Sequence, residues 1–217
     1  METTRTLFVG DVHGCADELL TLLRTAAPER VVLLGDVFTK GPDAPGVWTL
    51  IREHRAVGIL GNHDAAMLAR PDRGGGPLPR RAWTWLEALP LMRKGDDPRG
   101  RAWRAVHAGL HPHRGASGTS RQMALTLRRF PDDRELGHPF WWQDYRRRRL
   151  VLYGHDARRG LVDRRPWTLG LDTGCVYGGA LSGYLLEEDR VLQVPARRIY
   201  VDPLARRTGR ELRVRRG

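Results

Sequence analysis

LFVGDVHG, at residues 7–14, is an apolar run that stops at a glycine and is followed at once by an aspartate and a histidine. The same order recurs in GDV at 35–37, GNHD at 61–64, VHAG at 106–109, YGHD at 153–156 and LDTGC at 171–175. Short apolar runs that end at glycine are typical of buried strands that stop at a loop. We therefore expect strands at 7–9, 31–34, 57–60 and 150–153, with their polar tips gathered along one rim.

The first five motifs, from GDVHG to YGHD, supply candidate metal ligands with oxygen or nitrogen atoms and no thiolate. These residues are Asp11, His13, Asp36, Asn62, His107 and His155. This mixture suits divalent ions such as manganese, iron, zinc or cobalt. The set exceeds the roughly three or four protein ligands that one catalytic zinc ion takes, so we expect two ions that share a carboxylate, with Asp36 as the bridge. Any single motif is more simply a tight turn or a helix cap, but chance does not account for all of them in this order.

Residues 7–185 resemble the phosphoprotein-phosphatase-like branch of the calcineurin-type metallophosphoesterases. The resemblance implies an α/β (α+β) fold of two mixed β-sheets packed as a sandwich and flanked by α-helices. It also implies one metal held by Asp11, His13 and Asp36, and a second held by Asp36, Asn62, His107 and His155. Within the branch, LDTGCVYGGALSG at 171–183 and GNHD rather than GNHE are most similar to symmetrical bis(5′-nucleosyl)-tetraphosphatases, and the protein serine/threonine phosphatases come second.

The second motif departs from the protein phosphatases, which have GDxVDRG where this chain has GDVFTKG. In those enzymes the acid at the position of Thr39 supports a histidine, matched here by His63, that protonates the departing alkoxide. A phosphate that leaves from an anhydride needs little such help, so Thr39 favours P–O–P substrates over phosphoserine. Lys40 replaces an arginine and would meet phosphate as a point charge. Asp64 either orients His63 or has a structural role.

These features predict a metal-dependent phosphohydrolase that splits diadenosine tetraphosphate into two ADP. We expect two divalent ions, with Mn²⁺ first and Fe, Zn or Co as alternatives. The candidate catalytic residues are His63, Asp36, Lys40 and Asp64, and the candidate substrate contacts are Lys40 and Tyr177. Three alternatives stay open: a protein serine/threonine phosphatase, an RNA 5′-end or cap hydrolase, and a non-catalytic nucleic-acid-binding module, which leaves the ligand set unexplained.

The chain has a formal net charge of +12, and all but Lys40 and Lys94 of its 37 basic residues are arginines. Such a surface would attract nucleotides, polyphosphate or RNA by long-range steering. The run at 146–149 is more simply a solvated loop, although it could lie near the rim of the site. A length of 217 residues fits one domain, 1–217, with a cap insert at 112–145 and a basic tail at 203–217.

No apolar run approaches the roughly 20 residues of a membrane helix, and the first strand follows the N-terminus too closely for a secretory segment. We therefore expect a cytoplasmic protein with no membrane or obligate protein partner, in which Cys15 and Cys175 are reduced thiols and Cys175 is a small buried filler. Helical spacing predicts helices at 17–26, 45–54, 64–69, 81–93 and 120–129, and strand alternation predicts a hairpin at 181–194.

Overall fold

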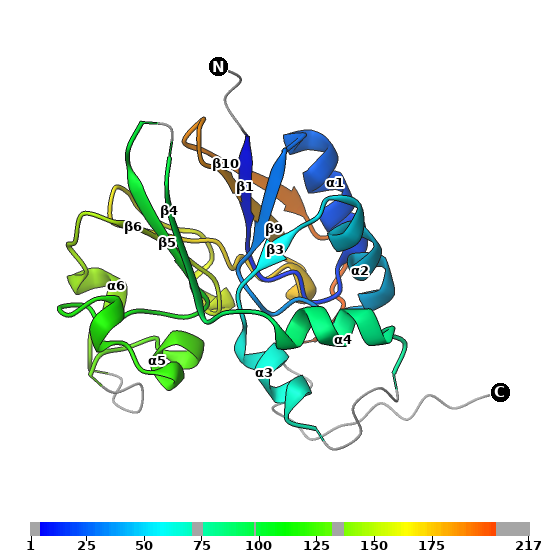
Figure 1. The fold of residues 1–217 in the computed structure, drawn as a ribbon, viewed down its shortest axis with the longest axis horizontal. Coiled ribbons are helices and arrows are strands. Elements are labelled where there is room, and N and C mark those ends of the chain that lie inside the picture. The colour runs from blue at the N-terminus through cyan, green and yellow to red at the C-terminus, as the bar shows by residue number, and fades with distance from the viewer. Residues whose placement is uncertain (1–4, 71–75, 98, 132–136, 203–217) are drawn as a thin grey trace.

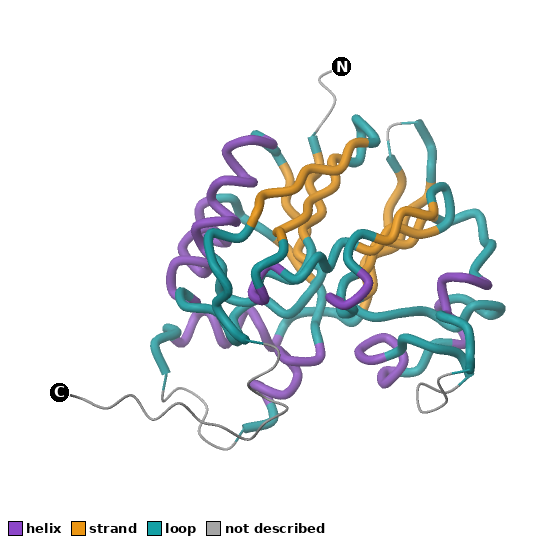
Figure 2. The backbone as a smooth tube through the Cα atoms, turned by 180° about the vertical axis from the view of Figure 1, so that it is seen from behind, coloured by secondary structure: helices purple, strands orange, loops and turns teal. Residues whose placement is uncertain are grey.

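The computed structural model describes residues 5–70, 76–97, 99–131 and 137–202. Two five-stranded sheets pack against each other, and helices lie outside both of them (Figure 1). Seen from behind, the strands form two separate groups with helices on either side (Figure 2). This arrangement confirms the predicted sandwich of two mixed sheets. The predicted basic tail at 203–217 lies outside the described residues.

The first sheet has the strand order β10-β9-β1-β2-β3 and combines the two ends of the described chain. Its elements, with the two helices on its outer face, are β1 (Thr6–Val9), α1 (Ala16–Ala26), β2 (Arg30–Leu33), α2 (Ala44–Glu53), β3 (Val57–Gly58), β9 (Ala180–Leu185) and β10 (Arg190–Pro195). β1, β2 and β3 run parallel, and β9 pairs antiparallel with β1 so that Leu7 lies opposite Leu185. The predicted terminal hairpin is the pair of β9 and β10.

The second sheet has the strand order β4-β5-β6-β8-β7, in which β5, β6 and β8 run parallel. The chain between the two parts of the first sheet forms α3 (Asn62–Leu68), α4 (Arg80–Glu87), β4 (Met92–Asp96), β5 (Ala102–Val106), α5 (Arg121–Thr126), α6 (Trp141–Asp144), β6 (Leu150–Tyr153), β7 (Val162–Arg164) and β8 (Thr168–Gly170). The insert at 112–145 carries α5 and α6, whose apolar side chains pack on the outer face of this sheet.

The apolar runs are continuous because the strands are buried on both faces. In β1, Phe8 packs between the sheets with Trp103, while Leu7 and Val9 pack under α1 and α2. The rings of Phe8 and Trp103 meet edge to face with centroids 4.8 Å apart, a favoured aromatic geometry. These layers hold the ends of the strands in fixed positions, which a site built on those ends requires.

Three predicted elements were too long. The helix predicted at 81–93 ends at Glu87, and the chain enters β4 at Met92. Pro90 lies between them, and proline cannot continue the helical hydrogen-bond pattern. The strand predicted at 57–60 is regular only at Val57–Gly58, because the Leu60 N–H donates to the carbonyl of Pro90 instead of a neighbouring strand. The helix predicted at 120–129 ends at Thr126.

Two further expectations concern the arginine run and the thiols. The run at 146–149 immediately precedes β6, whereas His155 follows the other end of that strand, so the run does not lie at the rim of the site. Cys15 and Cys175 are both unoxidised and buried, as expected. Within the described part of the chain, the helices are too short or too polar to cross a bilayer.

Candidate metal centre

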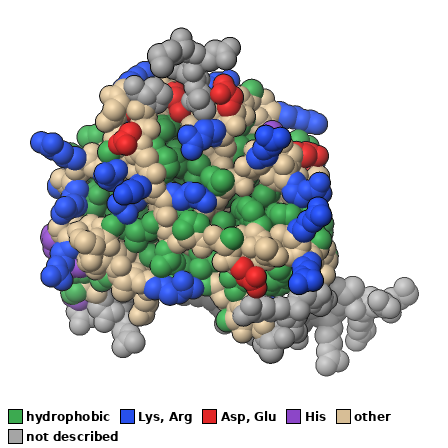
Figure 3. Space-filling model, viewed as in Figure 1, with side chains coloured by type: hydrophobic (Ala, Val, Ile, Leu, Met, Phe, Trp, Pro, Cys, Tyr) green, Lys and Arg blue, Asp and Glu red, His purple; other side chains and the backbone are tan. Residues whose placement is uncertain are grey.

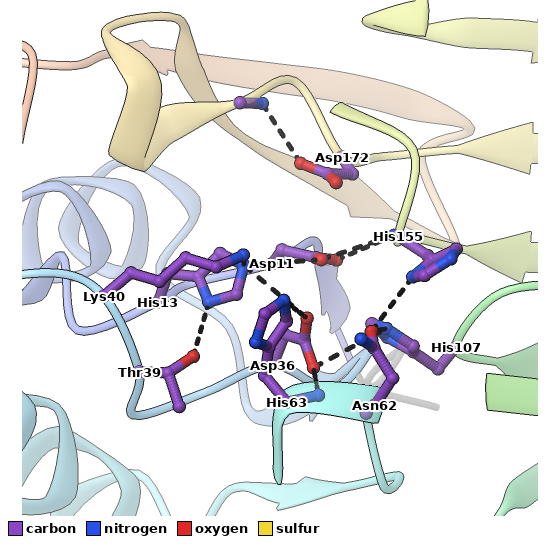
Figure 4. A network of polar contacts seen from close by, with 12 residues as sticks. Asp11, His13, Asp36, Thr39, Lys40, Asn62, His63, His107, His155 and Asp172 are labelled. Carbon is purple, nitrogen blue, oxygen red and sulfur yellow. Dashed lines mark hydrogen bonds and ion pairs between the residues drawn. The ribbon is translucent and has the colours of Figure 1, made fainter. Parts of the chain in front are cut away.

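The predicted ligands meet at the seam between the two sheets (Figure 4). Asp11, His13, Asp36 and Asn62 follow strands of the first sheet, whereas His107, His155 and a further aspartate, Asp172, follow β5, β6 and β8 of the second. In open sheets of parallel strands, such sites form beyond the carboxyl ends of the strands. Each sheet therefore contributes part of one polar cluster.

Asp36 lies at the centre of this cluster. Two groups of side chains have ligand atoms within 4.8 Å of one another: His13, Asp36 and His63, and Asp11, Asp36 and His107. The carboxylate oxygens of Asp36 lie 3.6 Å from Nε2 of His13 and 3.6 Å from Nε2 of His107. Asp36 is thus the member that the two groups share, as a bridging ligand would be.

The imidazole of His107 is oriented as a ligand. Its Nδ1–H donates to the carbonyl of Leu34 at 2.8 Å, which leaves Nε2 with a lone pair. Burial lowers the pKa of His107 and favours this neutral form. Nε2 lies 2.9 Å from Oδ1 of Asn62, and Nδ1 of His155 lies 3.0 Å from the same oxygen. Nε2 of His107 and Oδ1 of Asn62 both carry lone pairs, and two such atoms repel each other at this distance unless a cation binds them. The three atoms together therefore fit a metal ion.

The tautomer of His13 follows from its two neighbours. The ammonium of Lys40 lies 2.9 Å from Nε2 of His13 and can only donate, so Nε2 accepts. Nδ1 therefore carries the proton and donates to Oγ1 of Thr39 at 2.9 Å. Partners of this kind fix the ring orientation of metal-ligating histidines. The Nε2 lone pair, which accepts from Lys40 and lies 3.6 Å from Oδ2 of Asp36, is the one that a metal would take in place of Lys40.

This contact corrects the expected position of Thr39. The sequence placed Thr39 where the protein phosphatases have an acid beside the histidine matched by His63. In the structure the hydroxyl of Thr39 contacts His13, so Thr39 supports a candidate ligand rather than the candidate proton donor. A carboxylate introduced at position 39 would lie next to His13, and the substitution is therefore a poor test of the leaving-group argument.

Asp64 has the structural role that was one of its two predicted alternatives. Its carboxylate is fully buried and accepts hydrogen bonds from the backbone N–H groups of Asp36 at 2.7 Å, Val37 at 3.0 Å and Gly61 at 3.1 Å. These contacts anchor the loop that carries Asp36 to the start of α3. These contacts support a positioning role for Asp64, and its catalytic role stays a prediction.

The backbone at the site is held in sparsely populated conformations. Positive φ angles occur at His13 (47°), Asp36 (53°), Lys40 (69°) and His155 (73°). Non-glycine residues rarely adopt this region, and such strain tends to cluster at functional sites. The glycine before His155 is required for a different reason, because a Cβ atom at Gly154 would collide with Oδ1 of Asp11. The glycines of the motifs thus let backbone approach the carboxylates closely.

Three buried carboxyls give the centre an excess of negative charge. Burial raises the pKa of Asp11 well above its ordinary value, and the neighbouring charges of Asp172 and Asp36 raise it further. Burial likewise raises the pKa of Asp36 and of Asp172 to about 6. Such a cluster is stabilised by a cation, and the ammonium of Lys40 is close enough to lower all three pKa values. A divalent ion fits this charge balance.

Asp172 was not among the predicted ligands. Its signal was the LDTGC motif, which ends an apolar run in the same way as the other five motifs but was assigned no metal contact. Oδ1 of Asp172 accepts from the N–H of Gly174 at 3.1 Å, and its charge acts on Asp11, Asp36 and His107. Asp172 therefore belongs to the electrostatics of the centre.

Metal-free Asp172→Asn protein is expected to gain stability relative to the metal-free wild type as pH rises from about 4 to about 6. The folded-state pKa of Asp172, about 6, lies above the unfolded value. Between these two pKa values the folded wild type holds a proton that the unfolded chain has lost. The unfolding free energy of the wild type therefore falls as pH rises across this window. Asparagine keeps the acceptor for Gly174 and cannot ionise. The gain should be on the order of 1–3 kcal/mol.

Urea unfolding in the presence of a chelator, at several pH values between 4 and 7, measures this difference. Asp163→Asn is the matched control, because its hydrogen bond to Arg165 lowers the pKa of Asp163 and the variant should show no such gain. A wild-type-to-Asp172→Asn difference that stays constant over the pH range would contradict the prediction.

The two candidate substrate contacts lie together at the edge of the centre. Nζ of Lys40 is 5.4 Å from the centroid of the Tyr177 ring, close enough for a cation–π contact. Arg128, which follows α5 in the insert, reaches the same region: it lies 3.4 Å from the carbonyl oxygen of His155 and 3.5 Å from a carboxylate oxygen of Asp156. The insert therefore contacts the rim through Arg128, although α6 packs on the outer face of the second sheet.

Comparison with known proteins agrees with this geometry. Residues 4–194 match the family model described as calcineurin-like phosphoesterase, so the chain belongs to that family. It is a metal-dependent phosphohydrolase, and it is similar to the symmetrical bis(5′-nucleosyl)-tetraphosphatases. The resemblance predicted from the ordered motifs is thereby confirmed.

One similar protein is the symmetrical bis(5′-nucleosyl)-tetraphosphatase of Dechloromonas aromatica (strain RCB), which is 26% identical over 280 aligned positions, covering 93% of this chain and 99% of the relative. Because this alignment is longer than 217 residues, the relative has segments that this chain lacks. The enzyme of the same name from Aeromonas salmonicida (strain A449) is 33% identical over 144 residues, which cover 56% of this chain and only 51% of that relative.

Two solved structures share the fold of this chain. The crystal structure of a candidate diadenosine tetraphosphatase superposes with a TM-score of 0.80 and 33% sequence identity, covering 90% of this chain and 95% of that one. A protein serine/threonine phosphatase from Saccharomyces cerevisiae has a TM-score of 0.57 at 15% identity, with 89% of this chain and 80% of that chain covered. The second likeness shows a shared fold alone.

Proposed function

We propose that the protein is a dinuclear-metal phosphohydrolase that cleaves phosphoanhydride bonds of dinucleoside polyphosphates, with diadenosine tetraphosphate split into two ADP. The observation that carries the proposal is Asp36, which two groups of candidate ligands share at one seam. The resemblance assigns one ion to Asp11, His13 and Asp36 and the other to Asp36, Asn62, His107 and His155. This division differs from the two spatial groups, in which His63 joins His13 and Asp11 joins His107. When bound, such ions polarise a phosphoryl group and lower the pKa of a water molecule.

The remaining residues of the centre have roles that follow from their positions. His63 follows Asn62 in α3, its ring is one third exposed, and its Nε2 lies 3.9 Å from Oδ2 of Asp36. It is therefore placed to give a proton to a leaving group at the rim. Lys40 and Arg128 bring positive charge to opposite sides of the same cluster and would bind phosphate oxygens.

The choice of an anhydride substrate rests on charge and on the names of similar proteins. Basic side chains lie across the face of the molecule in Figure 3 and outnumber acidic ones there, and the net charge is +12. Long-range attraction of this kind favours a polyphosphate, which carries several negative charges. The similar proteins named above also carry tetraphosphatase names.

Product analysis tests the proposal. Purified protein with Mn²⁺ is incubated separately with diadenosine tetraphosphate, a phosphoserine peptide and a capped RNA, and the products are resolved by ion-exchange chromatography. We expect ADP as the only nucleotide product, formed faster than phosphate from the peptide. ATP together with AMP would indicate asymmetric cleavage, and preferred hydrolysis of the peptide or of the RNA would replace the proposal with that alternative. Replacing Mn²⁺ by Fe²⁺, Zn²⁺ or Co²⁺ identifies the most effective metal.

A further inference from the structure

A second basic site lies between the insert and the outer face of the second sheet. A pocket of about 580 Å³ is lined there by Arg104, Arg114, Gly115, Ala116, Ser117, Tyr145 and the run at 146–149. Arg104 lies in β5, and the arginine run immediately precedes β6. The run lies at the start of β6 whereas His155 follows its end, and the lining includes none of the candidate ligands, so the pocket is separate from the metal centre.

The arginines of this pocket form no ion pair with an acid in the part of the chain that the structure describes. Among the described residues, no ion pair joins Arg104, Arg114 or any arginine of the 146–149 run to an acid, whereas Arg101 and Arg165 elsewhere on the surface pair with Asp97 and Asp163. The lining itself contains no acidic residue. Six guanidinium groups are thus gathered around one concavity whose described lining contains no acidic side chain.

Two of these cations contact neutral groups of the protein. Arg147 donates to the carbonyl of His113 at 2.8 Å, and Arg146 donates to the carbonyl of Tyr145 at 2.8 Å while stacking over the ring of Trp167 at 4.7 Å. A guanidinium group has five N–H donors, so each of these contacts leaves donors for a ligand. Ordering the side chains before binding also reduces the entropy cost of recognition.

Arg104 supplies the floor of the pocket and is partly buried. Burial lowers the pKa of Arg104, and the charge of Arg149 lowers it further. Its side chain contacts the sulfur of Met92 at 3.6 Å, which is a weak acceptor. A ligand with negative charge spread over several atoms would relieve the repulsion between Arg104 and Arg149.

We propose that this pocket binds a linear polyphosphate chain, supplied by a nucleoside triphosphate or by inorganic polyphosphate. Guanidinium groups bind phosphate oxygens in a two-pronged geometry, which favours phosphate over a compact monovalent anion. The volume is that of a small-molecule site rather than an extended groove. Tyr145, the aromatic residue of the lining, is 2% exposed and offers no platform for stacked bases, whereas single-stranded RNA sites combine basic grooves with exposed rings.

Binding of inorganic tripolyphosphate to the full-length chain tests this site apart from the metal centre. The Asp36→Asn background and a chelator disable the centre, so the result does not depend on the proposed hydrolytic function. Isothermal titration should give saturable binding of one tripolyphosphate per chain. Arg104→Gln with Arg147→Gln should weaken it by at least about tenfold, whereas a control of equal charge loss on exposed helix positions, Arg52→Gln with Arg81→Gln, should weaken it by less than about twofold.

A second double variant, Arg114→Gln with Arg148→Gln, replaces exposed side chains of the same pocket. It tests the site independently if the first double variant does not fold. Unliganded melting temperatures of all variants are compared, and the rise in melting temperature with tripolyphosphate should be reduced in both pocket pairs. ATP and tripolyphosphate are titrated in parallel: equal affinity supports recognition of the chain alone, and tighter ATP binding supports a nucleoside polyphosphate. Equal losses in the pocket and control variants, or tighter binding of a 5′-hydroxyl oligoribonucleotide than of tripolyphosphate, would overturn the proposal.

Discussion

Asp36→Asn is expected to lower kcat/KM for diadenosine tetraphosphate by well over about a hundredfold. Loss of an outer-shell partner of a metal typically costs about 10- to 100-fold, and Asp36 is the carboxylate that both candidate ligand groups share. Asparagine keeps an oxygen for the N–H of His63, which donates to Asp36 at 2.9 Å, so the start of α3 should be preserved. Steady-state rates with Mn²⁺, together with metal content by mass spectrometry, measure the effect.

The matched control is Asp17→Asn, which removes an exposed carboxylate paired with Arg197 and should change the rate little. Chelation of wild-type protein should abolish turnover, and added Mn²⁺ should restore it. Full activity of thoroughly metal-stripped protein, or near-normal activity of Asp36→Asn, would contradict the two-ion proposal.

His63→Asn should impair hydrolysis of a phosphoserine peptide far more than hydrolysis of diadenosine tetraphosphate. Proton donation typically contributes about 10²–10⁴-fold when the leaving group is poor, as the serine alkoxide is. A leaving phosphate is already stabilised as an anion, so the anhydride reaction should lose much less. The ratio of the two kcat/KM values, variant against wild type, is the quantity measured, with both substrates assayed at saturating metal.

His54→Asn, at the end of α2, is the control for a histidine outside the centre and should leave the ratio unchanged. Equal losses for both substrates in His63→Asn, or a wild-type preference for the phosphopeptide, would move the assignment to a protein phosphatase. This test replaces substitution of Thr39, because the hydroxyl of Thr39 contacts His13.

The convergence of the six ligands could be predicted from a local pattern, whereas the sandwich was predicted from the family resemblance that the ordered motifs carry. An apolar run buried on both faces must be a strand in the interior, and a glycine followed by polar residues marks its end. The parallel order of β1, β2 and β3 then brings Asp11 and Asp36 to the same edge without further information. Element lengths were less predictable, since Pro90 and the pairing of β4 decided where α4 could end.

The contacts around the ligands could not be predicted from the same pattern. Left-handed backbone at Asp36 and Lys40 sets the direction in which Thr39 points, and residue preferences do not predict such conformations. The assignment of Asp64 depended on which backbone N–H groups its carboxylate would reach. The pocket at the arginine run required the positions of the insert and of β5, which are distant in sequence from each other and from the run.

The pairing of β1 with β9 has a consequence for the order of events during synthesis. Leu7 pairs with Leu185, so β1 acquires one of its two neighbours only after all the strands of the second sheet have been made. Contacts between such distant segments slow folding, and an unpaired strand edge invites association with other chains. Asp11, His13 and Asp36 are therefore made more than about 100 residues before His155, and the candidate metal centre cannot be complete until the second sheet has left the ribosome.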